Sequence, residues 1–298
     1  MKRVFMKVLL VIVLLSSLQS DDGKKEKTSQ ELTTIIPYAV YINYGDKSAK
    51  KDGKIYGLYA NIGTLDYLVE LNYIKLNFTY KDDTTSDLKQ DEVTMIYHKY
   101  WDSYSLKIGA NINSTTDEDL QNGKTLILGA SQWQWFGYDK LTYGMDYYNS
   151  YYGDGKDLDY ISAKVSVHQF TPYVNYSQVI NNSSRNIISF NANFEKIDAY
   201  TDEKYYESYE LRDTVYYNNA YLELGLLVGE MRTGVIDGGM IIYNSKDLLT
   251  NSYSAKFGYY LNPQTNLNLS YRNTTYDEYN EEEDTKRDVI SAMISYKF

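Results

Sequence analysis

The chain has 298 residues, with no Cys, 3 Pro, 35 Tyr and a formal net charge of −10. The lack of Cys excludes disulfides, zinc ribbons, iron–sulfur clusters and thiol catalysis, and an aromatic content of 15% argues against intrinsic disorder. A pI near 4.8 argues against nucleic acid as a partner, and a mean hydropathy of −0.52 argues against a helical membrane protein. Because Tyr supplies much of the 43% apolar content, few oily residues remain for the core of a soluble domain.

Residues 1–20 have the layout of a secretory signal peptide. Three basic residues lead into an apolar run, Val8–Leu15, which is followed by small and polar residues. The run is too short to cross a bilayer as a helix, so we expect cleavage near Ser20. A retained membrane anchor is the alternative. Without this segment the chain would hold 27 basic and 40 acidic residues, a net charge of −13.

Residues 21–34 are polar, charged and aperiodic, and we expect them to form a flexible periplasmic leader. From residue 35 to residue 298 the pattern changes to segments of alternating character separated by turns. Alternation with period two is the signature of a strand with two different faces. One such face consists of Tyr104, Leu106, Ile108, Ala110 and Ile112, and another of Ile188, Phe190, Ala192 and Phe194. The sequence therefore predicts an all-β fold over residues 35–298.

Short and long connections alternate along the chain. The short ones are predicted at 64–66, 101–103, 137–139, 182–186, 218–219 and 262–264. The longer, charged ones are predicted at 45–53, 81–90, 114–123, 153–157, 199–206, 232–250 and 277–287. This regularity is typical of an up-and-down antiparallel transmembrane barrel, which has tight periplasmic turns and long external loops.

The strand count depends on residues 158–181. If they form one strand, the barrel has about fourteen strands and both termini lie at the short-turn end; twelve or sixteen strands stay possible. Apolar residues change face on the two sides of Pro172, which predicts a β-bulge there. A similar change near Tyr73 and Ile74 leaves the directions of Glu70 and Lys75 open.

The signal peptide, the one-sided strands, the aromatic strand ends and the final segment VISAMISYKF resemble Gram-negative outer-membrane β-barrels of the porin-like kind. The resemblance implies that Ile294, Tyr296 and Phe298 form the signal read by the barrel-assembly machinery. It also implies an outer-membrane location, with lipid and lipopolysaccharide as surroundings. It indicates a class of protein rather than one function.

Tyrosine then has a physical role, because Tyr and Trp concentrate where hydrocarbon meets headgroups. The periplasmic girdle is predicted to contain Tyr97, Tyr100, Trp101, Tyr104, Trp133, Trp135, Phe136, Tyr138, Tyr216 and Tyr217, and the outer girdle Tyr147, Tyr148, Tyr151, Tyr152, Tyr205, Tyr206 and Tyr209. Aromatic packing in a soluble β-protein is the alternative.

Charged residues opposite the apolar faces are candidates to line a lumen, since a charge at mid-strand is costly toward lipid and tolerated toward water. They are Lys107, Asp146, Glu195, Glu210, Arg212, Glu223, Lys256 and Arg272. Four are acidic and four are basic, which favours a water-filled pore for small polar solutes over a pore for one sign of ion. Alternatively, they pair across the interior and plug it.

Catalysis and metal binding have weak support. Ser166 and His168 lie on one face of a strand, but barrel lipases and deacylases carry His-x-Ser, whereas the order here is Ser-x-His. Acidic clusters at 117–119 and 281–284 could hold Ca²⁺ or Mg²⁺, but neither has a calcium-loop spacing. We therefore predict no enzyme, no metal site and no cofactor.

The sequence as a whole predicts a passive outer-membrane channel for small hydrophilic solutes. The longest loop, 232–250, could fold into the lumen as a constriction. The alternative is a structural or adhesive surface barrel without useful conductance, and an outer-membrane hydrolase is a distant third. The expected partners are lipid, lipopolysaccharide, the assembly machinery and small polar solutes, with no nucleic acid.

Overall fold

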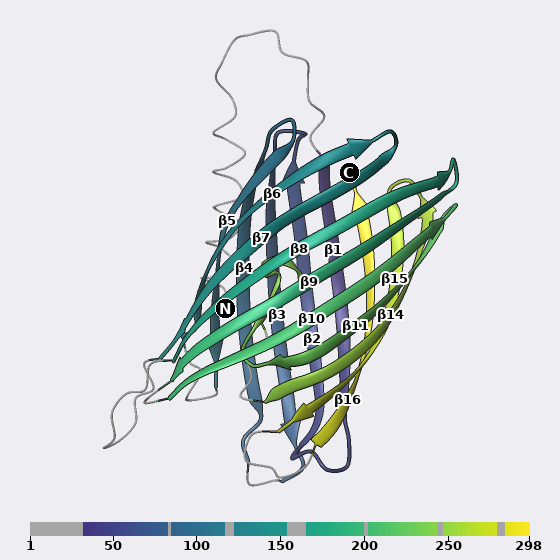
Figure 1. Cartoon of the computed structure of the whole chain (residues 1–298). Coiled ribbons are helices and arrows are strands. Elements are labelled where there is room, and N and C mark those ends of the chain that lie inside the picture. The colour runs from purple at the N-terminus through teal and green to yellow at the C-terminus, as the bar shows by residue number, and fades with distance from the viewer. Residues whose placement is uncertain are drawn as a thin grey trace, which may run out of the picture. The chain divides into compact units, whose positions relative to one another are not determined.

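Over its described residues, the chain forms a closed antiparallel barrel of fourteen strands (Figure 1). Strands that follow one another in the sequence are paired, except that β11 pairs with β14 and β1 closes the barrel on β16. The computed structural model describes residues 32–82, 85–116, 122–153, 165–199, 202–242, 247–278 and 284–298. The predicted signal peptide and most of the predicted leader lie outside these residues. In the described part of the chain, no helix has the length and apolar character needed to cross a membrane.

The wall strands have the following bounds. They are β1 Leu32–Tyr44, β2 Lys50–Gly63, β3 Tyr67–Tyr80, β4 Leu88–Tyr100, β5 Tyr104–Thr115, β6 Lys124–Phe136, β7 Asp139–Tyr152, β8 Val165–Asn181, β9 Ser184–Ala199, β10 Asp202–Tyr217, β11 Ala220–Met231, β14 Leu248–Asn262, β15 Thr265–Asp277 and β16 Asp284–Lys297. Two further strands, β12 Val235–Ile236 and β13 Ile241–Ile242, form a separate small sheet around the 3₁₀ turn η2, Asp237–Gly239.

The barrel closes where β1 pairs with β16, in a register that runs from Thr34 opposite Lys297 to Tyr44 opposite Arg287. The amide of Phe298 donates to the carbonyl of Thr33 at 2.9 Å, so the last residue continues this seam. Because the strand number is even, β1 begins and β16 ends at the same rim. The prediction of about fourteen strands is confirmed.

The two rims differ as the alternation of connections predicts. The short-turn rim carries connections of two or three residues, at 64–66, 101–103, 137–138, 182–183, 218–219 and 263–264. At the long-loop rim the connections join β1 to β2, β3 to β4, β5 to β6, β7 to β8, β9 to β10, β11 to β14 and β15 to β16. Residues 158–164, predicted as the start of the strand over 158–181, lie outside the described residues. One predicted long loop, 199–206, is wrong. Its charged residues suggested a loop, but Asp202, Glu203 and Lys204 pair with β9. Charge does not end a strand whose backbone groups are paired.

The predicted bulge at Pro172 is also wrong. The register between β8 and β9 is the same on both sides, with Phe170 opposite Phe194 and Tyr173 opposite Asn191. The irregularity lies instead between Val179 and Asn181, next to the short turn. Pro172 cannot donate to a ladder, but it is accommodated within one continuous strand.

Apolar residues change face along β8 because the interior itself becomes apolar toward the long-loop rim. Val167 points inward and is buried with Tyr152 and Ile197, whereas Val174 and Tyr176 point outward. The same effect explains β3, where Ile74 is buried inside. There Glu70 points inward and accepts a hydrogen bond from Tyr59, and Lys75 pairs with the outward Tyr56.

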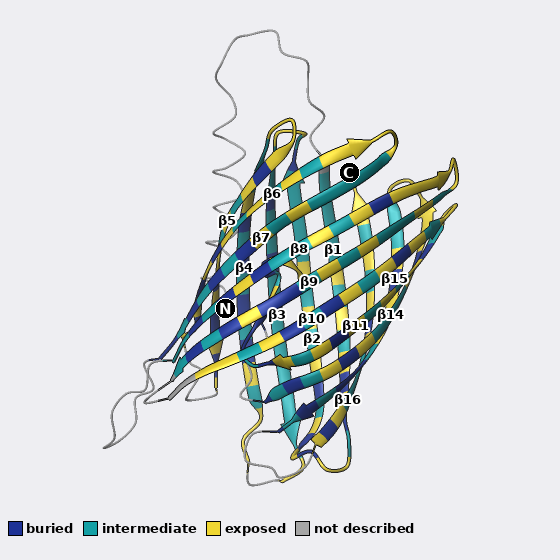
Figure 2. Cartoon of the chain, viewed as in Figure 1, coloured by how far each residue is buried: buried dark blue, intermediate teal, exposed yellow. Residues whose placement is uncertain are grey.

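Side chains alternate between the two faces of the wall, and this produces the banded exposure along the strands in Figure 2. On β5, Leu106, Ile108 and Ile112 are each at least half exposed on the outer face, while Ser105 and Asn111 are buried inside. An outer surface of large exposed apolar side chains around a polar interior is the arrangement of a membrane-spanning barrel.

The aromatic residues divide differently from the prediction at the long-loop rim. Near the short turns, Trp101, Tyr104 and Tyr217 are exposed on the outside, as expected. Trp135, predicted for the same girdle, shares the inward face of β6 with Ile127, and Lys140 lies over its ring. Tyr148 and Tyr152, predicted for the outer girdle, are instead buried inside the barrel. The error arises because consecutive tyrosines in a strand point to opposite faces, so at most alternate members of such a cluster can face the headgroups.

The outward band predicts the effect of a charge at mid-strand. Ile108→Lys should lower the free energy of unfolding in lipid by about 2–4 kcal/mol, because it places an ammonium group toward hydrocarbon. The measurement is denaturant unfolding in bilayers.

Leu65→Lys is the matched control, since Leu65 is 87% exposed in a short turn, and it should change the free energy by less than about 1 kcal/mol. Equal losses in the two variants would contradict the assignment of this face to lipid.

Candidate functional site: the lumen and its inner loop

Between β11 and β14, the described residues 232–242 fold into the barrel and are called the inner loop. Its strands β12 and β13 pair Val235 with Ile242 and Ile236 with Ile241. The reversal between them places Asp237, Gly238 and Gly239 at φ values of 50°, 68° and 109°. A Cβ on Gly239 would lie 3.0 Å from the Cδ1 atoms of Ile96 and Ile127. Glycine is therefore required there by both the backbone angle and the close approach of the wall.

An apolar contact fastens the inner loop to one side of the wall. Val235 and Ile242 are buried together with Ile96, Ile127 and Tyr148, and Met240 packs against this cluster. Because fully burying a side chain of this size contributes about 1.5–3 kcal/mol, the contact is a substantial part of the docking energy.

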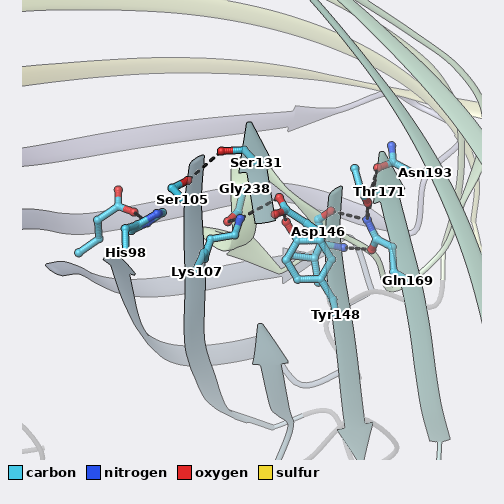
Figure 3. Close-up of polar contacts among 12 residues, drawn as sticks. His98, Ser105, Lys107, Ser131, Asp146, Tyr148, Gln169, Thr171, Asn193 and Gly238 are labelled. Atoms are coloured by element: carbon cyan, nitrogen blue, oxygen red, sulfur yellow. Dashed lines mark hydrogen bonds and ion pairs between the residues drawn. The ribbon is translucent and has the colours of Figure 1, made fainter. Parts of the chain in front are cut away.

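Gln169 on β8 holds the backbone of the inner loop with both ends of its amide. Its Nε2 donates to the carbonyl of Val235 at 2.8 Å, and its Oε1 accepts from the Val235 amide at 2.6 Å. The side chain is 1% exposed, and Nε2 also donates to Thr171 Oγ1 at 3.0 Å. These contacts lie together in Figure 3. A buried wall side chain thus satisfies the backbone groups of the loop.

Lys107 on β5 reaches the tip of the inner loop. Its Nζ lies 2.7 Å from Asp146 Oδ2 and donates to the carbonyl of Gly238 at 2.9 Å. Tyr148 donates to the same Asp146 oxygen at 2.9 Å, so the carboxylate is shared by two donors (Figure 3). The charge on Lys107 is therefore neutralised within the site.

Arg212 on β10 fixes the other side of the reversal. Its Nη2 lies 2.8 Å from Glu210 Oε1 and 2.6 Å from Asp237 Oδ1. Burial favours the neutral form of Asp237, but Arg212, Arg272 and Lys256 more than offset this and lower the pKa of its carboxyl to about 2. Asp237 is therefore an anion bound to the wall at neutral pH.

Two further contacts complete the anchoring. Glu195 on β9 accepts from the amide of Arg232 at 2.9 Å, and Asn72 on β3 donates to the carbonyl of Met240 at 3.0 Å. Strands from β3 to β10 all contribute to holding the inner loop, so it crosses the interior instead of lining one side.

All eight charged residues predicted to face the lumen lie on the inward face. Lys107, Glu195 and Arg212 contact the inner loop directly, and Asp146 and Glu210 act through Lys107 and Arg212. The other three, Glu223, Lys256 and Arg272, lie on β11, β14 and β15, with Glu223 opposite Lys256 in the register. Lys256 and Arg272 act on the reversal only through their charges, which help to keep Asp237 ionised. Their lining of a path for solutes stays a prediction.

A polar cavity of about 290 Å³ lies between the inner loop and the wall. Its boundary is formed by β5, β7, β8, β9, β10 and the tip of the inner loop. The lining residues are Lys107, Asp146, Tyr148, Thr171, Tyr173, Asn175, Asn191, Asn193, Glu210, Val235, Ile236, Asp237 and Gly238. The interior thus holds the inner loop and, beside it, a space for a small molecule.

Sequence reasoning missed the wall residues that receive the inner loop, above all Gln169 and Asn72. Polar residues are common on the inward faces of barrels, and the sequence does not indicate which of them contact a loop. Ile96 and Ile127 did carry a signal. Each sits in a run of consecutive apolar residues, Met95–Tyr97 and Leu126–Leu128, so one member must point inward and requires an apolar partner there.

The Ser166 and His168 pair is close but not arranged for catalysis. Ser166 Oγ lies 3.4 Å from His168 Nε2, and Asp198 Oδ2 lies 3.9 Å from the same nitrogen. Tyr147 Oη and Asn149 Nδ2 lie 2.8 and 2.9 Å from Nδ1 of His168. Ser166 and His168 lie on the face of β8 opposite to that of the buried Val167 and Gln169, so they point away from the lumen.

The remaining predicted sites are placed as follows. Ile294, Tyr296 and Phe298 all point outward, and the last two rings contact each other edge to face at 4.8 Å; their role in assembly stays a prediction. The acidic cluster at 117–119 and most of that at 281–284 lie outside the described residues. Within the described ranges, no group of three or more His, Cys, Asp or Glu side chains is placed to hold a metal ion.

No protein-family model matches this sequence, and no curated protein does. Solved structures do match. A structure described as the CymD monoaromatic hydrocarbon channel has a TM-score of 0.53 at 8% identity, covering 91% of this chain and 89% of that one. The TodX deltaS2S3 mutant monoaromatic hydrocarbon channel has a TM-score of 0.52 at 8% identity, covering 91% of both chains.

A third similar structure is CdiB from Acinetobacter baumannii, with a TM-score of 0.51 at 10% identity, covering 89% of this chain and 60% of that one. At such identities the similarity concerns the fold alone. The predicted resemblance to Gram-negative outer-membrane barrels is confirmed at that level, since the chain has the closed barrel of this class.

The two hydrogen bonds between Gln169 and the backbone of Val235 predict that a variant without them loses protection from hydrogen exchange in the inner loop. Gln169→Leu removes both bonds to Val235 and leaves its buried amide and carbonyl unpaired, at about 1–3 kcal/mol for each group. Hydrogen exchange of the amides at 235–239 should become faster, while exchange in β8 and β9 stays slow. Unchanged exchange in the inner loop would mean that the apolar contact holds it alone.

The low pKa of Asp237 predicts the pH range over which its contact with Arg212 persists. A carboxyl whose pKa falls on folding contributes stability above its unfolded pKa of 3.8, and this contribution is lost as pH falls toward 2. The Asp237 carboxyl, followed by NMR, should therefore titrate near pH 2 and stay ionised from pH 4 to 8. Arg212→Gln should move the midpoint upward, and a midpoint unaffected by this change would contradict the pairing.

Proposed function

We propose that this protein is an outer-membrane channel for the passive diffusion of small hydrophilic solutes, with the inner loop as its constriction. The observation that carries the proposal is the contrast between the faces of one wall. Large apolar side chains cover the outside, while Asn, Ser, Thr and paired charges cover the inside next to a polar cavity. Water-lined interiors of this kind are found in barrels that pass polar solutes.

The similar folds include channels described for monoaromatic hydrocarbons. The cavity of the present chain favours a different solute, because its walls present carboxylates, amides and an ammonium group. An apolar solute would lose nothing by staying in lipid and would leave these groups without water. We therefore propose polar solutes, and we propose an export signal in residues 1–20 and a periplasmic leader after it.

The alternative is a structural or adhesive surface barrel without useful conductance, and one observation favours it. Four apolar clusters occupy the interior, among them Ile42 with Tyr44 and Tyr276, and Leu227 with Met231 and Leu249. Together with the inner loop they narrow the half of the lumen toward the long-loop rim. Lipid, lipopolysaccharide and the assembly machinery would be the partners of either kind of barrel.

Deleting residues 235–246 tests the proposal and separates the two functions. Met231 lies opposite Leu249 in the register, so the four residues that remain between β11 and β14 suffice for an ordinary hairpin connection. In planar bilayers the intact barrel should conduct in small steps, and the deletion should raise the single-channel conductance severalfold.

Gln169→Leu is the companion variant, because it weakens the hold on the loop without shortening the chain, and it should increase current noise. A barrel that is silent both intact and after the deletion would favour the structural alternative. A conducting barrel with the same current after the deletion would remove the inner loop from the mechanism.

A further inference from the structure

We propose that the cavity beneath the inner loop is a binding site for a neutral polyhydroxylated solute of the size of a mono- or disaccharide. The inference rests on the proposed function, because such a solute would meet this cavity on its way through the lumen. It goes further by assigning a chemical class and a place of contact.

The charges at the cavity are already paired with one another. Lys107 is held by Asp146 and by the carbonyl of Gly238, and Arg212 is held by Glu210 and Asp237. An ionic solute would have to break one of these pairs and leave a charge uncompensated, which is costly in a confined site. A neutral solute can form hydrogen bonds with the lone pairs and N–H hydrogens of these charged groups that the ion pairs do not use. The ion pairs then stay intact.

The amides at the cavity provide both kinds of hydrogen-bonding group in fixed orientations. Asn191 donates to Glu210 Oε2 at 3.1 Å. Asn193 accepts from Thr171 Oγ1 at 3.0 Å and from Gln169 Nε2 at 3.4 Å and donates to Ser208 Oγ at 3.2 Å, so it keeps one donor hydrogen. Each side-chain amide has two donor hydrogens and an oxygen that accepts twice, so these bonds use part of the capacity. Asn175 lines the same wall and makes no hydrogen bond to another described side chain. Hydroxyl groups, which donate and accept, match amides of this kind.

The remaining lining suits a small ring with an apolar face. Tyr173 and Tyr148 bring aromatic carbon to the cavity, while Val235 and Ile236 bring aliphatic carbon. Binding pockets commonly combine such surfaces with a few oriented polar groups in volumes of about 300–1,000 Å³. A cavity of about 290 Å³ lies at the small end of this range and excludes long oligosaccharides.

Calorimetric titration of the intact, detergent-solubilised barrel tests the site directly. The probes are glucose and maltose, with gluconate and glucosamine as charged analogues of similar size. We expect saturable binding of a neutral sugar, and binding of both charged analogues weaker by about tenfold or more. Equal affinity for a charged analogue, or no saturable binding of either neutral sugar, would overturn the assignment.

Two variants locate the site. Asn175→Leu and Asn191→Leu should each weaken sugar binding about 3- to 10-fold, the value of one hydrogen bond. Asn61→Leu is the matched control: it removes one inward amide bond, to Tyr59 at 3.0 Å, outside the cavity lining, and should leave the affinity unchanged. Asn175→Leu breaks no bond to a described side chain, so it keeps the test decisive if Asn191→Leu does not fold. Unchanged affinity in Asn175→Leu would place the sugar elsewhere.

Conductance of the same preparation keeps the two proposals separate. A barrel that conducts ions but binds no sugar would retain the channel and overturn the sugar site. A barrel that binds sugar at this wall but conducts nothing would retain the site and overturn the channel.

Discussion

The structure depends on one constraint: every backbone N–H and C=O group in a membrane-spanning sheet needs a partner inside the sheet. The pairing of β1 with β16 meets this constraint by removing both edges. Once the sheet is closed, the two-residue period of each strand divides all side chains into an outward and an inward set. The outward set is dominated by large apolar side chains, because lipid is apolar. The inward set is free to vary, and the inner loop, the charge pairs and the cavity all belong to it.

The fold could be predicted from the sequence because closure and alternation leave a regular trace. The alternating faces of β5 and β9 and the short turns all follow from backbone geometry, which acts on every strand alike. Errors arose where a local feature was given too much weight. Pro172 suggested a bulge, yet β8 keeps one register with β9 on both sides of it. The charged 199–206 segment suggested a loop, yet its residues from Asp202 onward pair with β9.

The site could be predicted only in part, for a different reason. The inward direction of Lys107 and Arg212 followed from parity, but their partners did not. Lys107 meets Gly238 across 131 positions of sequence, and Asn72 meets Met240 across 168. No spacing rule connects residues so far apart. The tyrosine clusters illustrate the same limit. Nothing in the sequence distinguishes Tyr148 from the other tyrosines, and it contacts the inner loop only because the loop lies opposite it in the folded barrel.

Those separations also bear on the order of folding. Contacts between distant parts of a chain form late, because the ends of a long loop lose entropy when they are brought together. The wall residues that contact the inner loop come from β3 to β10, so this contact surface forms only when these strands are paired side by side. Docking of the inner loop therefore requires that these wall strands are already paired. The inner loop thus occupies the interior as a bound ligand would, although it belongs to the same chain as the wall.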